Sequence, residues 1–325
     1  TDPYYIRYPP NSTPRHYSKI YATWIFIDSY LQDFYGDKHR GGFFVEAGAL
    51  DGEYMSNTLQ LEQAYNWTGL LVEPDSDNYS ELLKTKRKAW LSPSCLSLYS
   101  FPHASLLKKS RENDEESNWL MRATSSLITN EDSFGRDNPK IFTLYETVQC
   151  FPTDSLLSAL NVTHVDFFSL DIEMVEAEVL SNFPFEKISV DLWAIEHRIL
   201  GVPQLKEPAS LMNYTLADLK KFGFSANIIE TREKLIDTFE DQKFIKFMIS
   251  KGYYYLDMTC ALVGDYLFLR KASNLFKSLK VPKEREFRTY VCEEKKVHAV
   301  AWPSFEIKSL RDPHHYPGLQ YKDLI

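Results

Sequence analysis

Residues 43–53 read Phe43-Phe44-Val45-Glu46-Ala47-Gly48-Ala49-Leu50-Asp51-Gly52-Glu53. An apolar run that ends in an acid and two glycines predicts a buried strand followed by a tight turn, because glycine adopts backbone conformations closed to other residues. A helix is expected next, over residues 56–65, with Ser56 as its N-cap. A strand, a tight turn and a helix form the repeating unit of open parallel sheets.

The same order of elements recurs along the chain at a spacing of roughly 30 residues. A second strand over residues 70–72 ends in Glu73 and precedes a helix over 77–86. Later strands are predicted at 165–171, 190–195, 253–256 and 266–269, and later helices at 154–160, 175–180, 216–222 and 242–251. The sequence therefore predicts an α/β fold with a doubly wound, mostly parallel sheet.

The pattern divides the chain into three parts. We expect residues 1–40 to form an N-terminal arm and a helix, residues 41–275 the α/β domain, and residues 276–325 a C-terminal extension. Within the domain, the polar residues of 103–140 interrupt the rhythm, which indicates a surface insertion. Such an insertion is either a lid over a site or a plain solvated loop.

Composition excludes several classes of protein. The 325 residues are 44% apolar and carry a net charge of −8, which is typical of a globular protein and gives no footprint for nucleic acid. The basic run Lys84, Lys86, Arg87, Lys88 is interpreted as the solvated end of a helix. No apolar stretch reaches the roughly 20 residues of a membrane span. The chain starts at Thr1 without a methionine, so we expect any targeting segment to lie outside this sequence.

Two features indicate the secretory pathway. Glycosylation sequons begin at Asn11, Asn66, Asn78, Asn161 and Asn213. The four cysteines, Cys95, Cys150, Cys260 and Cys292, lack metal-ligand spacing and permit two disulfides in any of three pairings, or four buried thiols. Together the sequons and cysteines favour a glycoprotein of the lumen of the endoplasmic reticulum or Golgi, or of the extracellular space.

Four predicted strands each bring an acid to one edge of the sheet. These acids are Glu46, Glu73, Asp171 and Glu196. Ligands bind at the carboxyl ends of strands in open parallel sheets, so the four acids mark a candidate site. Glu73, at the end of the second strand, is suitably placed to accept hydrogen bonds from the two hydroxyls of a ribose.

The acids distinguish between two ribose-containing cofactors. The dinucleotide fingerprint needs a third glycine to seat a pyrophosphate, and this chain lacks it. Glu46, Asp51 and Glu53 crowd the turn and would repel a pyrophosphate. They suit the sulfonium and ammonium groups of S-adenosylmethionine, so the electrostatics favour this methyl donor over NAD.

Three motifs carry a resemblance to a known family. They are Phe44 to Glu53 with Ser56-Asn57-Thr58, then Gly69-Leu70-Leu71-Val72-Glu73-Pro74, and then Asp166-Phe167-Phe168-Ser169-Leu170-Asp171-Ile172-Glu173 with Glu176. In order and spacing they resemble the FkbM methyltransferases. With Lys88-Ala89-Trp90-Leu91-Ser92-Pro93-Ser94-Cys95-Leu96-Ser97, the chain resembles the animal branch that includes the insect Star protein.

The resemblance covers about residues 40–270 and implies a seven-stranded, Rossmann-like class I methyltransferase fold. It implies that Glu46, Gly48 and Gly52 line the methionine part of S-adenosylmethionine, that Glu73 binds its ribose, and that Asp51 approaches the sulfonium. Asp171 borders the same cofactor, and residues 95–98 with Thr153 or Asp154 contact the adenine. An ordinary turn at the glycines and a solvated acid at position 51 are the alternatives.

Methyl transfer to a hydroxyl needs a base, and the sheet edge offers three candidates. They are Asp171, Glu173 and His197, and histidine has the ordinary pKa best suited to the task. Asp171, Glu196 and His197 could instead hold a divalent metal, which is the less favoured interpretation.

One departure from the family concerns the acceptor. The family usually has glycine after its Asp-x-Glu, where this chain has Met174.

We expect a secretory-pathway O-methyltransferase that acts on a carbohydrate or another small hydroxyl acceptor. The alternative is a Star-like binding or trafficking protein with protein cargo, tethered to the membrane outside this chain, that keeps the fold without turnover.

Overall fold

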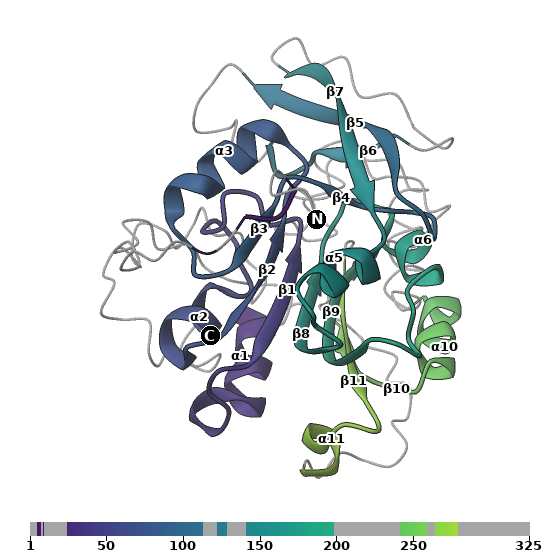
Figure 1. Cartoon of the computed structure of the whole chain (residues 1–325). Coiled ribbons are helices and arrows are strands. Elements are labelled where there is room, and N and C mark those ends of the chain that lie inside the picture. Colours follow the sequence, from purple (N-terminus) through teal and green to yellow (C-terminus); the bar gives the residue numbers. More distant parts are fainter. Residues whose placement is uncertain are drawn as a thin grey trace, which may run out of the picture.

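The computed structural model describes residues 5–7, 9, 25–112, 122–128, 141–197, 241–258 and 264–278. Its centre is a seven-stranded sheet with the strand order β10-β11-β9-β8-β1-β2-β3 (Figure 1). The strands are β1 Phe43–Ala47, β2 Thr68–Val72, β3 Trp90–Ser92, β8 His164–Leu170, β9 Ser189–His197, β10 Tyr253–Met258 and β11 Gly264–Arg270. Only β11 runs against its neighbours. The predicted doubly wound, mostly parallel seven-stranded sheet is confirmed.

Helices cover both faces of this sheet (Figure 1). On one face lie α1 Ile25–Phe34, α2 Leu59–Tyr65 and α3 Ser76–Thr85, with the short α11 Asn274–Ser278 at the margin. On the other face lie α5 Thr153–Ala159, α6 Glu176–Ser181 and α10 Gln242–Ser250. Each face has its own apolar core, which is why the central strands are apolar on both sides.

The helix starts follow from local chemistry. Asp75 caps α3 by accepting the backbone N–H groups of Asp77 and Asn78, and Asp241 caps α10 in the same way. The helix predicted from Ser56 begins at Leu59 instead, because the Ser56 hydroxyl is drawn to the Glu46 carboxylate, to which it donates at 2.8 Å.

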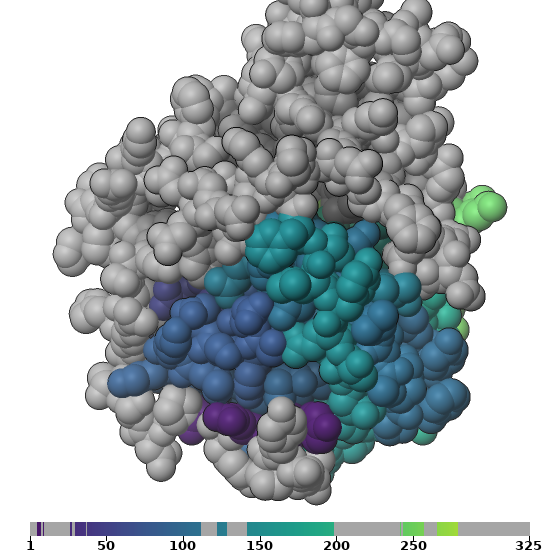
Figure 2. Space-filling view, turned by 90° about the horizontal axis from the view of Figure 1, so that it is seen from above, coloured from purple at the N-terminus to yellow at the C-terminus, as the bar shows by residue number. Residues whose placement is uncertain are grey.

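Part of the predicted insertion 103–140 belongs to a second, four-stranded sheet. β5 His103–Glu112 and β7 Ile141–Phe151 pair antiparallel over their length, with β4 Cys95–Leu96 and β6 Ser126–Leu127 beside them. In Figure 2 the teal residues of the β7 region lie between two blue surfaces from earlier in the chain. Residues 113–121 and 129–140 of the predicted insertion lie outside the described residues.

Ion pairs explain why such a polar segment forms an ordered strand. On β5, Lys109 and Arg111 are buried, and both contact Asp75 and Asp77 at the start of α3. Lys109 also pairs with Glu146 of β7 at 3.0 Å. A disulfide between Cys95 and Cys150 joins β4 to β7. One of the anticipated disulfides is thereby identified, while Cys260 and Cys292 lie outside the described residues.

The basic run at the end of α3 is not solvated throughout. Arg87 has no exposed side-chain surface, and it pairs with the equally buried Glu62 at 2.8 Å. Its guanidinium also donates to the Gly52 carbonyl and to the hydroxyls of Ser56 and Thr58. The interpretation of Arg87 as a surface charge was wrong, because α2 and the turn after β1 close over it.

The structure describes only parts of the predicted N-terminal arm and C-terminal extension. Arg7 pairs with Leu91 through two backbone hydrogen bonds, so this residue of the N-terminal arm lies beside the edge strand β3. The predicted helix at 216–222 and most of the extension 276–325 lie outside the described residues. Among the described helices, none is long and apolar enough to cross a membrane.

We predict that Arg87→Met lowers the free energy of unfolding by about 3–5 kcal/mol, because it leaves the buried Glu62 carboxylate without its cation. Lys84→Met is the matched control, since its pair with Glu81 is exposed and should change stability by at most about 0.5 kcal/mol. Urea unfolding measures both. A loss at Arg87 no larger than that at Lys84 would contradict the structural role assigned to this residue.

Candidate functional site

The four predicted acids lie at one edge of the main sheet, as expected. Glu46 and Glu196 are the penultimate residues of β1 and β9, and Glu73 and Asp171 directly follow β2 and β8. The strands β9, β8, β1 and β2 are consecutive in the sheet, so all four acids come from adjacent strands. The edge therefore gathers acidic groups over the middle of the sheet, but their surroundings differ.

Glu46 is occupied by the loop that follows β1. It accepts hydrogen bonds from the hydroxyls of Ser56 and Thr58 and from the backbone N–H of Asn57. Burial raises the pKa of Glu46 above its usual range, although Arg87 and these hydrogen bonds act against the rise. The carboxylate thus shapes the loop at residues 56–58, and any role toward the methionine part of a cofactor stays a prediction.

Gly48 is placed where no other residue fits. Its φ is +85°, and a Cβ at this position would come within 1.8 Å of the Asp171 carbonyl oxygen. The backbone on either side is held by hydrogen bonds from Gly48 N to the Val72 carbonyl and from Asp171 N to the Ala47 carbonyl. Gly48 is itself exposed, so the ends of β1, β2 and β8 meet around an open stretch of backbone.

Gly52 and Asp51 stabilise the tight turn that follows β1. Gly52 has φ +76°, and a Cβ there would meet the Leu82 side chain of α3 at 2.3 Å. Asp51 accepts the backbone N–H groups of Glu53 and Tyr54 and is buried. These contacts match the alternative of an ordinary turn, and they leave a cofactor role for either residue untested.

Glu73 and Asp75 are close acids with opposite behaviour. Glu73 accepts the backbone N–H groups of Leu50 and Asp75, and burial together with the Asp75 charge raises its pKa to about 8. Burial would raise the pKa of Asp75 too, but Arg111, Ser125 and Lys109 hold it below its usual value. The second sheet thus keeps Asp75 ionised, and that charge acts on Glu73.

A cluster of acids lies at the ends of β8 and β9. Carboxylate oxygens of Asp171, Glu173 and Glu196 lie within 4.8 Å of one another, which is close enough to ligate one metal ion. Desolvation and the neighbouring Glu196 raise the pKa of Asp171 well above its usual range, and they raise those of Glu176 and Asp265 to about 8. Oxygen ligands of this kind suit Mg²⁺, Mn²⁺ or Ca²⁺.

His197 does not join this cluster. Its ring Nε2 lies 3.0 Å from the Asp241 carboxylate, and the ring stacks on Phe244 with centroids 4.1 Å apart. Successive residues of a strand point to opposite faces, so His197 is turned away from Glu196. The predicted convergence of Asp171, Glu196 and His197 is wrong in its third member, whose place Glu173 takes.

The segment after β8 has a strained backbone. Glu173 has φ +58° and Met174 has φ +81°, a region that side-chain-bearing residues rarely occupy. The Glu176 carboxylate accepts the backbone N–H groups of Ile172 and Met174 and so closes this loop. A left-handed conformation explains why glycine is expected after the Asp-x-Glu. Met174 keeps that conformation and is 37% exposed.

One residue of the edge was not among the predicted site residues. Asn57 is buried, its amide nitrogen donates to Ser169 at 3.0 Å, and its amide oxygen has no hydrogen-bond partner among the described residues. An acceptor left open between β1 and β8 fits the ammonium group of an amino acid. The residues of this edge therefore fit S-adenosylmethionine.

Asp265 and Glu176 were also missed as members of the site. Asp265 stands at the start of β11, whose place beside β9 no local pattern reveals. Asp154, predicted near an adenine, lies half-buried in the first turn of α5.

The described sequons divide into two groups. Asn66 and Asn161 are exposed. Asn78 is 1% exposed, its amide nitrogen donates to the Arg122 carbonyl, and its amide oxygen accepts from the Arg122 guanidinium. A glycan on Asn78 is incompatible with this packing. The prediction of a glycosylation site at Asn78 is therefore wrong, and the residue has a structural role.

We predict that Gly48→Ala costs at least about 3 kcal/mol of stability, because it combines a backbone clash with a positive φ. Gly41→Ala is the control: its φ is +75°, but nothing lies within 4 Å of the added methyl, so only about 1 kcal/mol is lost. Chemical denaturation compares the two. Equal losses would mean that the ends of β1 and β8 are not in close contact.

The acid cluster also predicts a pH dependence. Each raised carboxyl is more basic in the folded chain than in the unfolded one, so its stabilising contribution is full below the unfolded pKa near 4. That contribution is lost as the pH rises through the folded values to about 8. The free energy of unfolding should therefore fall between pH 5 and about 8 in metal-free buffer.

Glu196→Gln should flatten this fall by about 1–2 kcal/mol, since it removes the charge that raises the three neighbouring pKa values. Glu178→Gln, an exposed position on α6, is the control. Urea titrations across the pH range give the comparison. A slope unchanged by Glu196→Gln would contradict the coupling.

Comparison with known proteins agrees with this geometry. The family model of the methyltransferase FkbM domain matches residues 46–244, more than half of the chain. Among solved structures, the chain is similar to the pyocyanin biosynthetic protein PhzM at 13% identity and a TM-score of 0.30. That alignment covers 75% of this chain and 54% of PhzM, so the chain spans about half of its length. No curated protein matches the chain. Since the family match covers residues 46–244, it contains the four predicted acids Glu46, Glu73, Asp171 and Glu196, and the chain belongs to the FkbM methyltransferase family.

Proposed function

We propose that the chain binds S-adenosylmethionine at the acidic edge and transfers its methyl group to a hydroxyl of a small acceptor, with carbohydrate as the favoured class. Methyltransferases of such families generally use this donor. The observation that carries the proposal is the meeting of Gly48, Glu73 and Asp171 at the ends of three adjacent parallel strands. Glu73 would hold the ribose of the donor, and the amide oxygen of Asn57 would accept from its ammonium group.

The acid cluster supports a hydroxyl as the acceptor. An alcohol must lose its proton during transfer, and a carboxylate whose pKa is raised toward the working pH is a suitable base. Asp171 has such a raised pKa and is the first candidate, and the carboxylate of Glu173, within 4.8 Å of it, is the second. His197 is the weaker candidate for this step, because its ring is hydrogen-bonded to the Asp241 carboxylate on the opposite face of the sheet.

The compartment is proposed from two observations. The disulfide between Cys95 and Cys150 favours an oxidising environment, and the sequons at Asn66 and Asn161 are exposed. Both fit the lumen of the secretory pathway or the extracellular space.

A second function deserves a test because of Met174. Met174 follows Glu173 at a positive φ, where the family usually has glycine, and its added side chain would narrow the approach of an acceptor. A Star-like binding or trafficking protein could retain strand ends that are shaped to bind the methyl donor, without catalysing methyl transfer. Binding of the donor therefore has to be measured separately from methyl transfer.

We predict that S-adenosylmethionine and S-adenosylhomocysteine bind the purified chain with micromolar affinity in calorimetric titrations. Glu73→Gln should weaken binding at least tenfold, because it replaces the ribose-binding carboxylate by an amide. Glu81→Gln, an exposed position on α3, should leave affinity unchanged.

Donor binding followed by methyl transfer to a glycan or another hydroxyl acceptor would establish the enzyme. A folded chain that binds neither compound would refute the donor site and favour the binding or trafficking role.

A further inference from the structure

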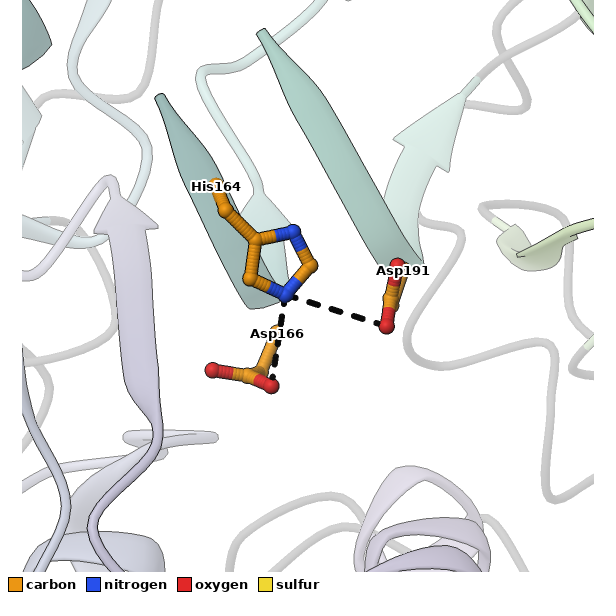
Figure 3. Close-up of side chains that lie close together, drawn as sticks. All are labelled: His164, Asp166 and Asp191. Atoms are coloured by element: carbon orange, nitrogen blue, oxygen red, sulfur yellow. Dashed lines mark ion pairs between the residues drawn. The ribbon is translucent and has the colours of Figure 1, made fainter. Parts of the chain in front are cut away.

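A second cluster of titratable side chains lies at the amino-terminal ends of the central strands, opposite the ends that carry the proposed donor site. The proposed methyltransferase function does not use this cluster. His164 and Asp166 lie at the start of β8, and Asp191 lies near the start of β9 (Figure 3). One ring nitrogen of His164 and one oxygen of each aspartate lie within 4.8 Å of one another. The acids of the proposed donor site stand at the other end of these strands.

Each aspartate has one oxygen fixed by a neighbour and the other directed at His164. Oδ2 of Asp166 accepts the backbone N–H of Phe43 at 2.8 Å, and Oδ1 lies 3.5 Å from Nε2 of His164 and 3.0 Å from Nε2 of His39. Oδ1 of Asp191 accepts two hydrogen bonds from Arg270, at 2.9 and 2.7 Å, which leaves Oδ2 facing the ring. Both carboxylates are therefore held in orientation before any ion binds.

The histidine is oriented in the same way. The Ser189 hydroxyl lies 2.8 Å from Nδ1 of His164 and donates to the Thr163 carbonyl. Nδ1 is then the donor of this pair, which leaves Nε2, the ring nitrogen that faces the two carboxylates, as the atom that would ligate an ion. Metal-binding histidines are typically held by such a hydrogen bond on the second ring nitrogen.

Nε2 of His164 forms long ion pairs with both aspartates (Figure 3), and the lengths of these pairs also match the spacing of ligand atoms around a metal ion. Nε2 of His164 lies 3.5 Å from Asp166 and 3.8 Å from Asp191, both longer than the 2.7–2.9 Å or so of a charge-assisted hydrogen bond. Around tetrahedral zinc, bonds of about 2.1 Å place neighbouring ligand atoms about 3.4 Å apart. His39, whose Nε2 lies 3.0 Å from Oδ1 of Asp166, is close enough to support that ligand.

We propose that His164, Asp166 and Asp191 form a binding site for a divalent transition-metal ion, with Zn²⁺ as the best match. The three ligands are one imidazole nitrogen and two carboxylate oxygens, and water completes the shell. His164 is 45% exposed, so an ion can enter from solvent. The ion would join the starts of β8 and β9, with Phe43 of β1 and Arg270 of β11 as supports, and so act on stability.

Zn²⁺ titration of the full, metal-stripped chain by calorimetry at neutral pH tests the site. His164→Gln and Asp191→Asn should each weaken binding of one Zn²⁺ at least tenfold, and Ser189→Ala should weaken it about tenfold through the loss of ring orientation. His103→Gln is the matched control, because this histidine lies on β5 and contacts Ser97. Zn²⁺ should also raise the melting temperature of the wild type and of His103→Gln, but not that of His164→Gln.

Two further results decide the proposal. Visible absorption of the Co²⁺-loaded chain should show the intense bands of a four-coordinate site, and these should disappear in His164→Gln. Absence of micromolar Zn²⁺ binding by the wild type would overturn the proposal, as would binding equal to wild type in both His164→Gln and Asp191→Asn. In either case a protonated His164 pairs with the two acids.

Discussion

The conformation of the candidate site depends on the contacts that the buried guanidinium of Arg87 makes. It contacts Glu62 of α2 and three groups of the turn after β1, and it has no exposed surface. A charge taken out of water is tolerated only when its surroundings are fully arranged around it. The turn therefore has one conformation, in which Ser56 and Thr58 bind Glu46 and the polar side chain of Asn57 lies between β1 and β8.

The acids of the proposed donor edge fall into two electrostatic classes. Glu46 and Asp75 receive hydrogen bonds and cations from elements that surround them, and these hold the chain in shape. Asp171, Glu176 and Asp265 are close to Glu196, and burial with like charge raises their pKa values. Raised carboxyls that share a small volume are typical of sites that take up a cation or move a proton. The cluster around Glu196 thus differs from Glu46 and Asp75 by its partners, not by its residue type.

The second sheet links distant parts of the chain to that edge. Lys109 and Arg111 alternate along β5 and place their charges on Asp75, whose charge in turn raises the pKa of Glu73. From the sequence, residues 103–112 were expected in a surface insertion, either a lid or a solvated loop, because a strand that buries cations lacks the apolar alternation by which strands are identified. Pairing with β7 and the acids at the start of α3 could be found only in three dimensions, since those partners are far away in the chain.

The amino-acid sequence by itself determined the main sheet, the edge that carries the acids, and the family. These depend on local signals: apolar runs, the glycines after β1 and the acid at each strand end, all encoded within a few neighbouring residues. The tertiary structure alone decided which acids meet, that His197 faces Asp241 and not Glu196, that Asn78 is too buried for a glycan, and that His164, Asp166 and Asp191 converge at the opposite edge. The direction of a side chain near a strand end and the burial of a single charge depend on long-range packing, which no local pattern contains.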